Sequence, residues 1–240
     1  MLKLLKQILI ENSMLKPVSL LSILSLLNFV TICYADSNNS ASTKQSIAKE
    51  EKLPTKDDVL AIDENDIIIG DVDAPVTVFE YSSLACPHCA TFHKENFEKL
   101  KAEYIDKKIV RYVHRDFPNT RPALMGSVLA RCSGQYEKYI NILFNSQMHW
   151  AYSQDYQERL RGIAKLGGMD NKQIDNCLSD NQISERILRS NLYASRVLNI
   201  NGTPAFVING EVLEGSKYSK IKAAIDKAFD ASKTSPASQP

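Results

Sequence analysis

Residues 76–89 read VTVFEYSSLACPHC, and this stretch decides the fold. Its first six residues are β-branched or aromatic except for Glu80, a composition that favours a strand buried on both faces in the middle of a sheet. From Cys86 onward the large side chains recur at helical spacing, at His93, Phe97, Leu100 and Tyr104. The sequence therefore predicts a buried strand that passes into a helix at or beside Cys86.

The remaining elements are predicted outward from this stretch. A second strand is expected over residues 108–113, and residues 121–200 carry only helical patterns, which predicts a helical insertion. Asn209-Gly210 then separates two apolar runs and favours a β-hairpin, because both turn positions need positive φ. A last helix has one apolar face formed by Tyr218, Ile221, Ile225 and Phe229. The order predicts an α/β core interrupted once by helices.

The composition is that of a globular protein. Of 240 residues, 44% are hydrophobic and 24% charged, which excludes general disorder, collagen and a polytopic membrane protein. With 29 basic and 28 acidic side chains, the charge gives no reason to expect a nucleic acid partner. The polar residues 36–56 are predicted to form a flexible tether, and residues 232–240 a disordered tail.

The first 35 residues have the composition of an export signal. Lysines dominate the charges before residue 17, and a charge-free apolar run follows and ends in Cys33-Tyr34-Ala35. This run is short for a bilayer span and ends in small residues at the positions that a signal peptidase reads. We predict a signal peptide over residues 1–35, cleaved after Ala35; translation from Met14 and an uncleaved anchor are the alternatives.

Four cysteines remain after the signal peptide: Cys86, Cys89, Cys132 and Cys177. In an exported chain an even number of cysteines indicates disulfides, and four allow three pairings. The gap of two residues favours a Cys86–Cys89 pair, which assigns Cys132 to Cys177. Both of the latter lie on apolar faces of predicted helices, so we predict a structural disulfide that clamps the insertion; two buried thiols are the alternative.

The Cys-Pro-His-Cys motif lies at a predicted helix start, where unpaired backbone N–H groups and the helix dipole stabilise an anion. The pKa of the Cys86 thiol should therefore be low, and a protonated His88 would lower it further. Pro87 fits the first turn because its missing N–H would have no partner there. A stabilised thiolate favours the reduced form, which makes the disulfide oxidising. We expect Cys86 to attack and be attacked, and Cys89 to resolve the mixed disulfide.

Glu80 is an ionisable residue within a strand that is otherwise apolar, where burial is costly unless the group is used or paired. We predict that it accepts the proton of Cys89; a strand-end carboxylate beside a water or a lysine is the alternative. His93 and Trp150 are predicted to be core or groove residues rather than catalytic ones. His114 belongs to no motif.

Other chemistry for the cysteine pair was weighed against these residues. A zinc site needs four ligands, and no second Cys-x-x-Cys accompanies His93. Covalent haem attachment needs a histidine directly after the second cysteine, where Ala90 stands. A purely structural disulfide is the remaining alternative, although so small a ring favours a labile bond. We expect no metal and no organic cofactor.

These motifs together resemble the DsbA-like branch of the thioredoxin-fold thiol:disulfide oxidoreductases. The similarity covers about residues 66–230 and includes Gly70-Asp71, Ala74-Pro75-Val76, Glu80, Cys86-Pro87-His88-Cys89 and Gly202-Thr203-Pro204-Ala205-Phe206. The resemblance implies an α/β thioredoxin-like domain over residues 57–119 and 195–231, with a helical insertion over 120–194. It also implies that Pro204 is cis beside the cysteine pair, and that Thr203 offers backbone groups to an extended substrate.

The resemblance further implies an exported, periplasmic enzyme that introduces disulfides into folding secreted proteins. Its reoxidation would require a membrane partner linked to quinones. Two alternatives stay open: a reductase or isomerase that uses the same site, and a chaperone-like module that binds peptides.

Overall fold

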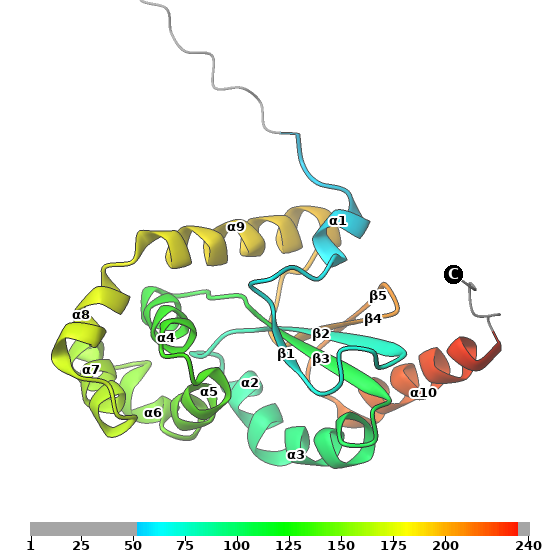
Figure 1. Ribbon diagram of the computed structural model, residues 1–240, viewed down its shortest axis with the longest axis horizontal. Helices are drawn as coiled ribbons and strands as arrows, with labels where there is room; N and C mark the ends of the chain where they lie inside the picture. Colours follow the sequence, from blue (N-terminus) through cyan, green and yellow to red (C-terminus); the bar gives the residue numbers. More distant parts are fainter. Residues whose placement is uncertain (1–51, 235–240) are drawn as a thin grey trace, which may run out of the picture. The chain divides into compact units, whose positions relative to one another are not determined.

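The computed structural model describes residues 52–234 (Figure 1). The predicted signal peptide lies outside the described residues, as do most of the predicted tether and the last six residues of the predicted tail. A five-stranded sheet in the order β1-β3-β2-β4-β5 forms the centre of the fold. Its strands are β1 (Ile67–Ile69), β2 (Val76–Ser82), β3 (Val110–Asp116), β4 (Ala205–Ile208) and β5 (Glu211–Glu214). Only β2 and β3 pair in parallel.

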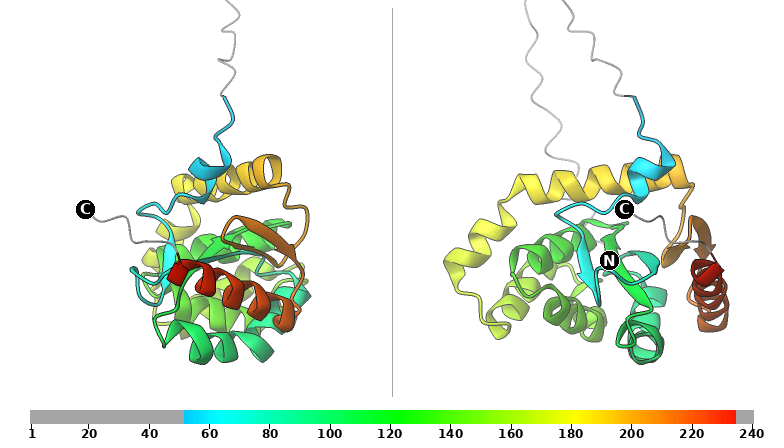
Figure 2. Two further views of the ribbon diagram at one scale, coloured as in Figure 1. Left: turned by 90° about the vertical axis from the view of Figure 1, so that its right-hand side faces the viewer. Right: turned by 45° about the vertical axis from the view of Figure 1, so that its right-hand side comes forward.

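Helices cover both faces of the sheet. One face carries α10 (Tyr218–Thr234) and a continuous helical run that begins with α2 (Pro87–Phe92), passes through π-helical turns at His93–Phe97 and Lys101–Ile105, and includes α3 (Glu98–Leu100). The opposite face carries α1 (Lys56–Leu60) and α9 (Asn181–Leu198), as Figures 1 and 2 show. Because successive side chains of β2 point to opposite faces, Val78 packs with the first group and Phe79 with the second. Both faces of β2 are therefore buried, as the sequence predicts.

Two short elements at the start of the domain, β1 and α1, were not predicted from the sequence. Strand β1 pairs antiparallel with β3 at the sheet edge, and its three isoleucines are too few to display a periodicity. Helix α1 begins at Lys56, which was predicted as the last residue of the tether. Its N-cap Thr55 and Asp58 form a reciprocal capping box, a local signal for a helix start.

Two further boundaries differ from the prediction. Strand β3 was expected over residues 108–113 but spans Val110–Asp116, because it pairs with the whole of β2 from Val76 to Ser82. Its polar end, His114 to Asp116, is buried rather than solvated. Helix α10 continues to Thr234, so the first three residues of the predicted tail are helical.

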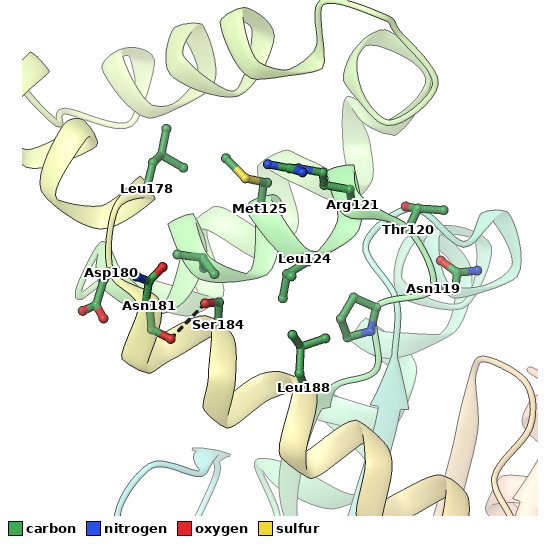
Figure 3. A pocket seen from close by; sticks show the side chains of 12 residues that line it. Asn119, Thr120, Arg121, Leu124, Met125, Leu178, Asp180, Asn181, Ser184 and Leu188 are labelled. Carbon is green, nitrogen blue, oxygen red and sulfur yellow. Dashed lines mark hydrogen bonds between the residues drawn. The ribbon is translucent and has the colours of Figure 1, made fainter. Parts of the chain in front are cut away.

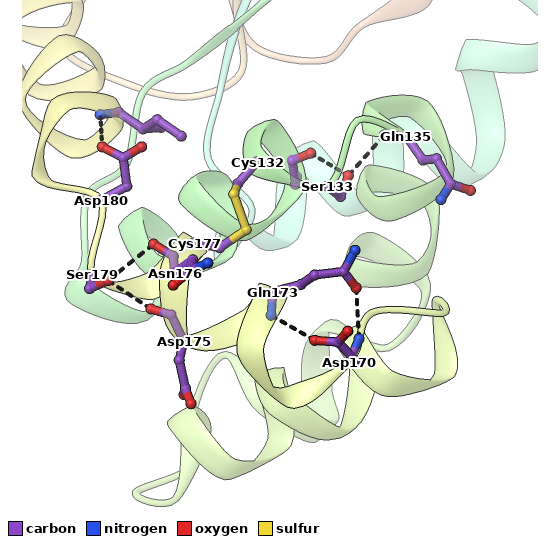
Figure 4. The surroundings of a disulfide bond; sticks show 12 residues. Cys132, Ser133, Gln135, Asp170, Gln173, Asp175, Asn176, Cys177, Ser179 and Asp180 are labelled. Carbon is purple, nitrogen blue, oxygen red and sulfur yellow. Dashed lines mark hydrogen bonds between the residues drawn. A yellow bond between two sulfur atoms is a disulfide. The ribbon is translucent and has the colours of Figure 1, made fainter.

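The segment between β3 and β4 contains only helices, as predicted, and the side chains of most of these helices share one core with Leu84, Cys86 and Cys89. They are α4 (Arg121–Cys132), α5 (Tyr136–Asn145), α6 (Gln147–Trp150), α7 (Tyr156–Leu166), α8 (Asn171–Leu178) and α9. Cys132 and Cys177 form a disulfide between the ends of α4 and α8, with Cα atoms 5.6 Å apart (Figure 4). Helix α9 extends back to the sheet, where Ala194 and Leu198 pack with Phe79. Among the described residues, no helix combines the length and apolar character needed to cross a membrane.

Candidate active site

Cys86 lies at the junction between the central strand and the first helix. Strand β2 ends at Ser82, and Cys86 is the N-cap of α2 with extended backbone angles, φ −84° and ψ 122°. Pro87 occupies the first turn, and no side chain caps the helix. The backbone N–H groups of His88 and Cys89 donate to the Cys86 sulfur instead. The helix start thus presents its unpaired donors to a thiol.

The loop before β4 closes the other side of Cys86. The Thr203–Pro204 peptide bond is cis, and the Cys86 Sγ lies 3.2 Å from the Thr203 carbonyl oxygen. Hydrogen bonds, first from the Cys89 thiol and then from the Thr203 side chain and the N–H groups of Cys89 and His88, outweigh burial and lower the pKa of Cys86 to about 5. Cys86 is therefore a thiolate at neutral pH.

Cys89 has the opposite electrostatic environment. It lies one turn further into α2 and is fully enclosed. Burial, its hydrogen bond to Cys86 and the negative charge of Glu80 together raise the pKa of Cys89 well above that of a free thiol. Both cysteines are free thiols in the structure. The dithiol form is therefore a stabilised thiolate beside a protonated neighbour.

Glu80 projects from β2 into a buried polar cluster. Its Oε2 lies 2.9 Å from His93 Nε2 and accepts a hydrogen bond from the Tyr112 hydroxyl at 2.5 Å, while Oε1 lies 3.2 Å from the same His93 nitrogen. Burial alone would raise the pKa of Glu80. The charge and hydrogen bond of His93, with His114 and Tyr112, overcome this effect and lower the pKa to about 2. The neighbours of this ionised carboxylate are two histidines and a tyrosine, rather than the lysine considered from the sequence.

Sequence reasoning missed the association of His93 and His114 with Glu80. His93 is buried, as predicted, but it is also an ion-pair partner of Glu80. Its spacing of four residues from Cys89 places both on one helix face, and that signal was available. His114 lies beside Glu80 because the two residues are register partners in β3 and β2. No local pattern reveals that register.

Glu80, His93 and His114 also have the donor types of a metal site. Glu80, His93 and His114 offer a carboxylate oxygen and two ring nitrogens within 4.8 Å of one another. Both carboxylate oxygens are already engaged by His93, and one of them also by Tyr112. We therefore interpret the cluster as an ion-pair network and not as a metal centre.

Helix α6 of the insertion holds the loop that carries Cys86. The Gln147 side chain is buried, and its Nε2 donates to the carbonyl oxygens of Leu84 at 2.8 Å and Cys86 at 3.0 Å. The Tyr152 hydroxyl donates to the carbonyl of Ala85 at 2.7 Å. Trp150 is fully buried, as predicted for a core residue. No pattern in the sequence indicates the role of Gln147.

A groove of about 460 Å³ lies between α4 and α9 (Figure 3). Its apolar lining comes from Leu124, Met125, Val128, Leu178 and Leu188. The segment Pro118–Thr120 forms one rim, and Asn119 accepts a hydrogen bond from Ser83 Oγ at 2.8 Å. Since Ser83 stands three residues before Cys86, the groove adjoins the loop that presents the thiolate.

Comparisons with known proteins agree with this geometry. The profile of a family described as thioredoxin matches residues 62–227. A Rickettsia bellii protein provisionally named a protein-disulfide oxidoreductase is 36% identical over 195 residues, which are 80% of this chain and 75% of that protein. The crystal structure of α-DsbA1 from Wolbachia pipientis superposes with a TM-score of 0.70 at 29% identity, covering 75% of this chain and 98% of that one. BdbD from Bacillus subtilis has the same fold, with a TM-score of 0.62 at 21% identity over 69% of this chain and 94% of that one.

The chain belongs to the thioredoxin family, and its sheet, its helical insertion and its Cys-x-x-Cys at a helix start have the arrangement of that fold. Within the family it is a DsbA-like protein-disulfide oxidoreductase.

Proposed function

We propose that this oxidoreductase is an exported thiol oxidase that passes the Cys86–Cys89 disulfide to folding proteins. The observation that supports this direction is the contrast between the two thiols, since the pKa of Cys86 is lowered to about 5 while that of Cys89 is raised. A stabilised Cys86 thiolate favours the dithiol form of the enzyme. A stable dithiol makes the disulfide a stronger oxidant.

The reaction uses the two cysteines in sequence. A substrate thiolate attacks the Cys86 Sγ, the Cys86–Cys89 bond breaks, and its electron pair moves to Cys89, which takes up a proton. A second substrate thiolate then attacks the substrate sulfur bound to Cys86. The new substrate disulfide leaves, and Cys86 departs as the stabilised thiolate.

The remaining residues have positioning and electrostatic roles in this proposal. Pro87 starts the helix, and the exposed His88 adds positive charge beside the thiolate when protonated. Glu80 exchanges the proton of Cys89 through its buried cluster. Thr203, held by the cis bond to Pro204, offers its backbone to an extended substrate segment across from Cys86.

The proposal also includes the domain boundaries, the cellular location and the partners of the protein. We assign residues 57–119 and 195–231 to the thioredoxin-like domain and 120–194 to the insertion, with the Cys132–Cys177 bridge as its structural clamp. The N-terminal segment directs export to the periplasm. Folding secreted proteins are the substrates, and a quinone-linked membrane protein restores the disulfide.

The test measures the potential and the direction of transfer on the mature chain. Equilibration with glutathione should give a Cys86–Cys89 potential well above about −270 mV, the thioredoxin level. The disulfide form should oxidise a reduced peptide with two cysteines, whereas Cys86→Ser should not. A potential at or below the thioredoxin level would assign the protein to reductases. Retained activity in Cys86→Ser would indicate a peptide-binding module.

A further inference from the structure

A chain of buried polar groups leads from Glu80 through His114 and Tyr136 to Asp116. We propose that His114 and Tyr136 form a proton relay that connects Glu80, and through it Cys89, to a solvent-facing pocket beside Asp116. The relay rests on the proposed function, because it serves the proton that Cys89 gains and loses in each cycle of disulfide exchange.

The need for a route follows from burial. Cys89 and Glu80 are both 0% exposed. During resolution of a mixed disulfide, Cys89 must lose its proton before its sulfur can attack, and during substrate oxidation it must take one up. A proton accepted by the Glu80 cluster cannot pass directly into bulk water. An isolated charge left in this core would cost several kcal/mol.

The geometry supplies successive donors and acceptors. The His114 Nε2 lies 3.7 Å from the Glu80 Oε2 and has no hydrogen-bond partner, although His114 is 0% exposed. Its other nitrogen, Nδ1, lies 2.6 Å from the Tyr136 hydroxyl oxygen. That hydroxyl also donates to Asp116 Oδ1 at 3.3 Å. These three contacts connect side chains of β2, β3 and α5 in the order Glu80, His114, Tyr136, Asp116.

The far end of this line reaches a pocket that opens to solvent. The pocket has a volume of about 50 Å³, sufficient for ordered water, and Asp116 and Arg131 are among its lining residues. The exposed side chains of Asp63 and Arg186 line it as well. Arg131 forms an ion pair with Asp116 and fixes the carboxylate at the end of the line. A proton that reaches Asp116 is therefore beside a pocket large enough to hold water.

The surroundings of His114 favour its neutral form before it receives a proton. The charged groups that act on it are Glu80 from β2, Asp116 from β3, His93 from the π-helical turn and Arg131 from α4, and Tyr136 from α5 contacts its Nδ1. Burial lowers the pKa of His114, against the raising effect of Glu80 and Asp116. Burial also raises the pKa of Tyr136 well above 10, so its hydroxyl can relay a proton without ionising.

One tautomer lets His114 and Tyr136 each both donate and accept, between the carboxylates of Glu80 and Asp116. With the proton on Nδ1, His114 donates to Tyr136 and Tyr136 donates to Asp116, while the lone pair of Nε2 faces Glu80. When Cys89 loses its proton to the Glu80 cluster, Nε2 accepts that proton and Nδ1 releases one along the line. The Cys89 thiolate attacks the Cys86 Sγ, the bond from Cys86 to the foreign sulfur breaks, and the electron pair leaves with the foreign thiolate.

The test isolates this step with glutathione as the foreign thiol. Dithiol enzyme is mixed with oxidised glutathione at a concentration that makes mixed-disulfide formation fast, and acid-quenched samples are followed by mass spectrometry. Formation reports Cys86, whereas decay of the mixed disulfide reports Cys89. We expect Tyr136→Phe and His114→Gln to slow the decay at least about tenfold and to change its pH profile, with formation unchanged.

Tyr139→Phe is the matched control. Tyr139 is another buried tyrosine of α5, but its hydroxyl donates to the Ala164 carbonyl at 3.0 Å, away from the Glu80 cluster. The mixed disulfide of the Tyr139→Phe variant should decay at the same rate as that of the unchanged protein. Normal decay in Tyr136→Phe, with normal formation as proof of folding, would overturn the relay. Peptide oxidation by the unchanged protein is measured in parallel, so that failure of the oxidase assignment is seen separately from failure of the relay.

Discussion

At the scale of single residues, two thiols only three positions apart have pKa values displaced in opposite directions. Cys86 receives hydrogen bonds from the Cys89 thiol, the Thr203 side chain and the first N–H groups of α2, all of which favour its thiolate. Cys89 is enclosed by the core and lies near the ionised Glu80, which favours its protonated form. One turn of helix thus separates the nucleophilic Cys86 thiolate from the Cys89 thiol, which must be deprotonated before it can react.

This difference predicts the alkylation behaviour of the dithiol form. The rate of reaction with iodoacetamide, measured from pH 3 to 9, should follow one titration with a midpoint at about 5, with modification at Cys86 alone. Replacing Cys89 by Ala removes the strongest hydrogen bond to the thiolate, so the midpoint should move upward. A midpoint near that of a free thiol, about 8.5, would contradict the assignment of the thiolate to Cys86.

At the scale of elements, the insertion completes the active site. The short helix α6 and the turn after it reach the loop around Cys86 through Gln147 and Tyr152, and α5 brings Tyr136 to His114. The disulfide at the end of α4 is adjacent to Arg131, the ion-pair partner of Asp116. The helices between β3 and β4 therefore cover the loop around Cys86, His114 and Asp116, and also hold these groups in position.

Gln147 provides a test of this contact. Gln147→Ala leaves two buried carbonyl oxygens without their donor, which should lower the free energy of unfolding by about 1–3 kcal/mol. It should also shift the Cys86 alkylation midpoint, because the loop is no longer fixed. Gln157→Ala on the exposed surface of α7 is the control and should be near neutral. Equal urea midpoints for the two variants would argue against a positioning role for Gln147.

The Cys132–Cys177 bridge should stabilise the insertion. It closes a segment with a sequence separation of 45, and α8 is also held at its start by the reciprocal bonds of Asp170 and Gln173 (Figure 4). Replacing both cysteines by Ala should cost about 2–4 kcal/mol in urea unfolding of the dithiol form. The Cys86 alkylation midpoint should remain near 5. An unchanged free energy of unfolding would mean that the bridge does not clamp the fold.

At the scale of the whole molecule, the site is assembled from segments distant in sequence. Strands β2 and β3 bring Glu80 and His114 together, the helical run adds His93, and the loop before β4 brings the Thr203 carbonyl to Cys86. Because only the dithiol form contains the Cys86 thiolate, the oxidation state changes how the stability of the whole fold depends on pH.

The sign of that dependence follows from the lowered pKa of Cys86. Between about pH 5 and pH 8 the unfolded dithiol chain binds a proton at this thiol that the folded chain does not, so folded stability rises with pH. The stability of the dithiol form relative to the disulfide form should therefore increase across this window and be lost as pH falls through about 5. Urea unfolding of both forms at several pH values measures the difference. Cys86→Ser should abolish the slope, and an unchanged slope would refute its origin in Cys86.

The sequence by itself determined the elements and the chemistry that depends on local order. The run 76–89 specified a buried strand, a helix start and a thiol pair, because strand burial, helix spacing and the acidity of a cysteine at a helix start are all set by near neighbours in the chain. Local patterns also predicted the hairpin at Asn209-Gly210 and the helical insertion. They did not predict the short elements β1 and α1, since three to five residues carry too little periodicity.

Only the tertiary structure decided which groups surround those thiols. The pairing of Glu80 with His93, the register that brings His114 alongside, and the reach of Gln147 and Tyr136 from the insertion depend on contacts between residues far apart in sequence. Such contacts follow from how layers pack and how strands align, and no periodicity of the chain encodes them. Local order therefore fixed the nucleophile, whereas packing fixed its proton environment.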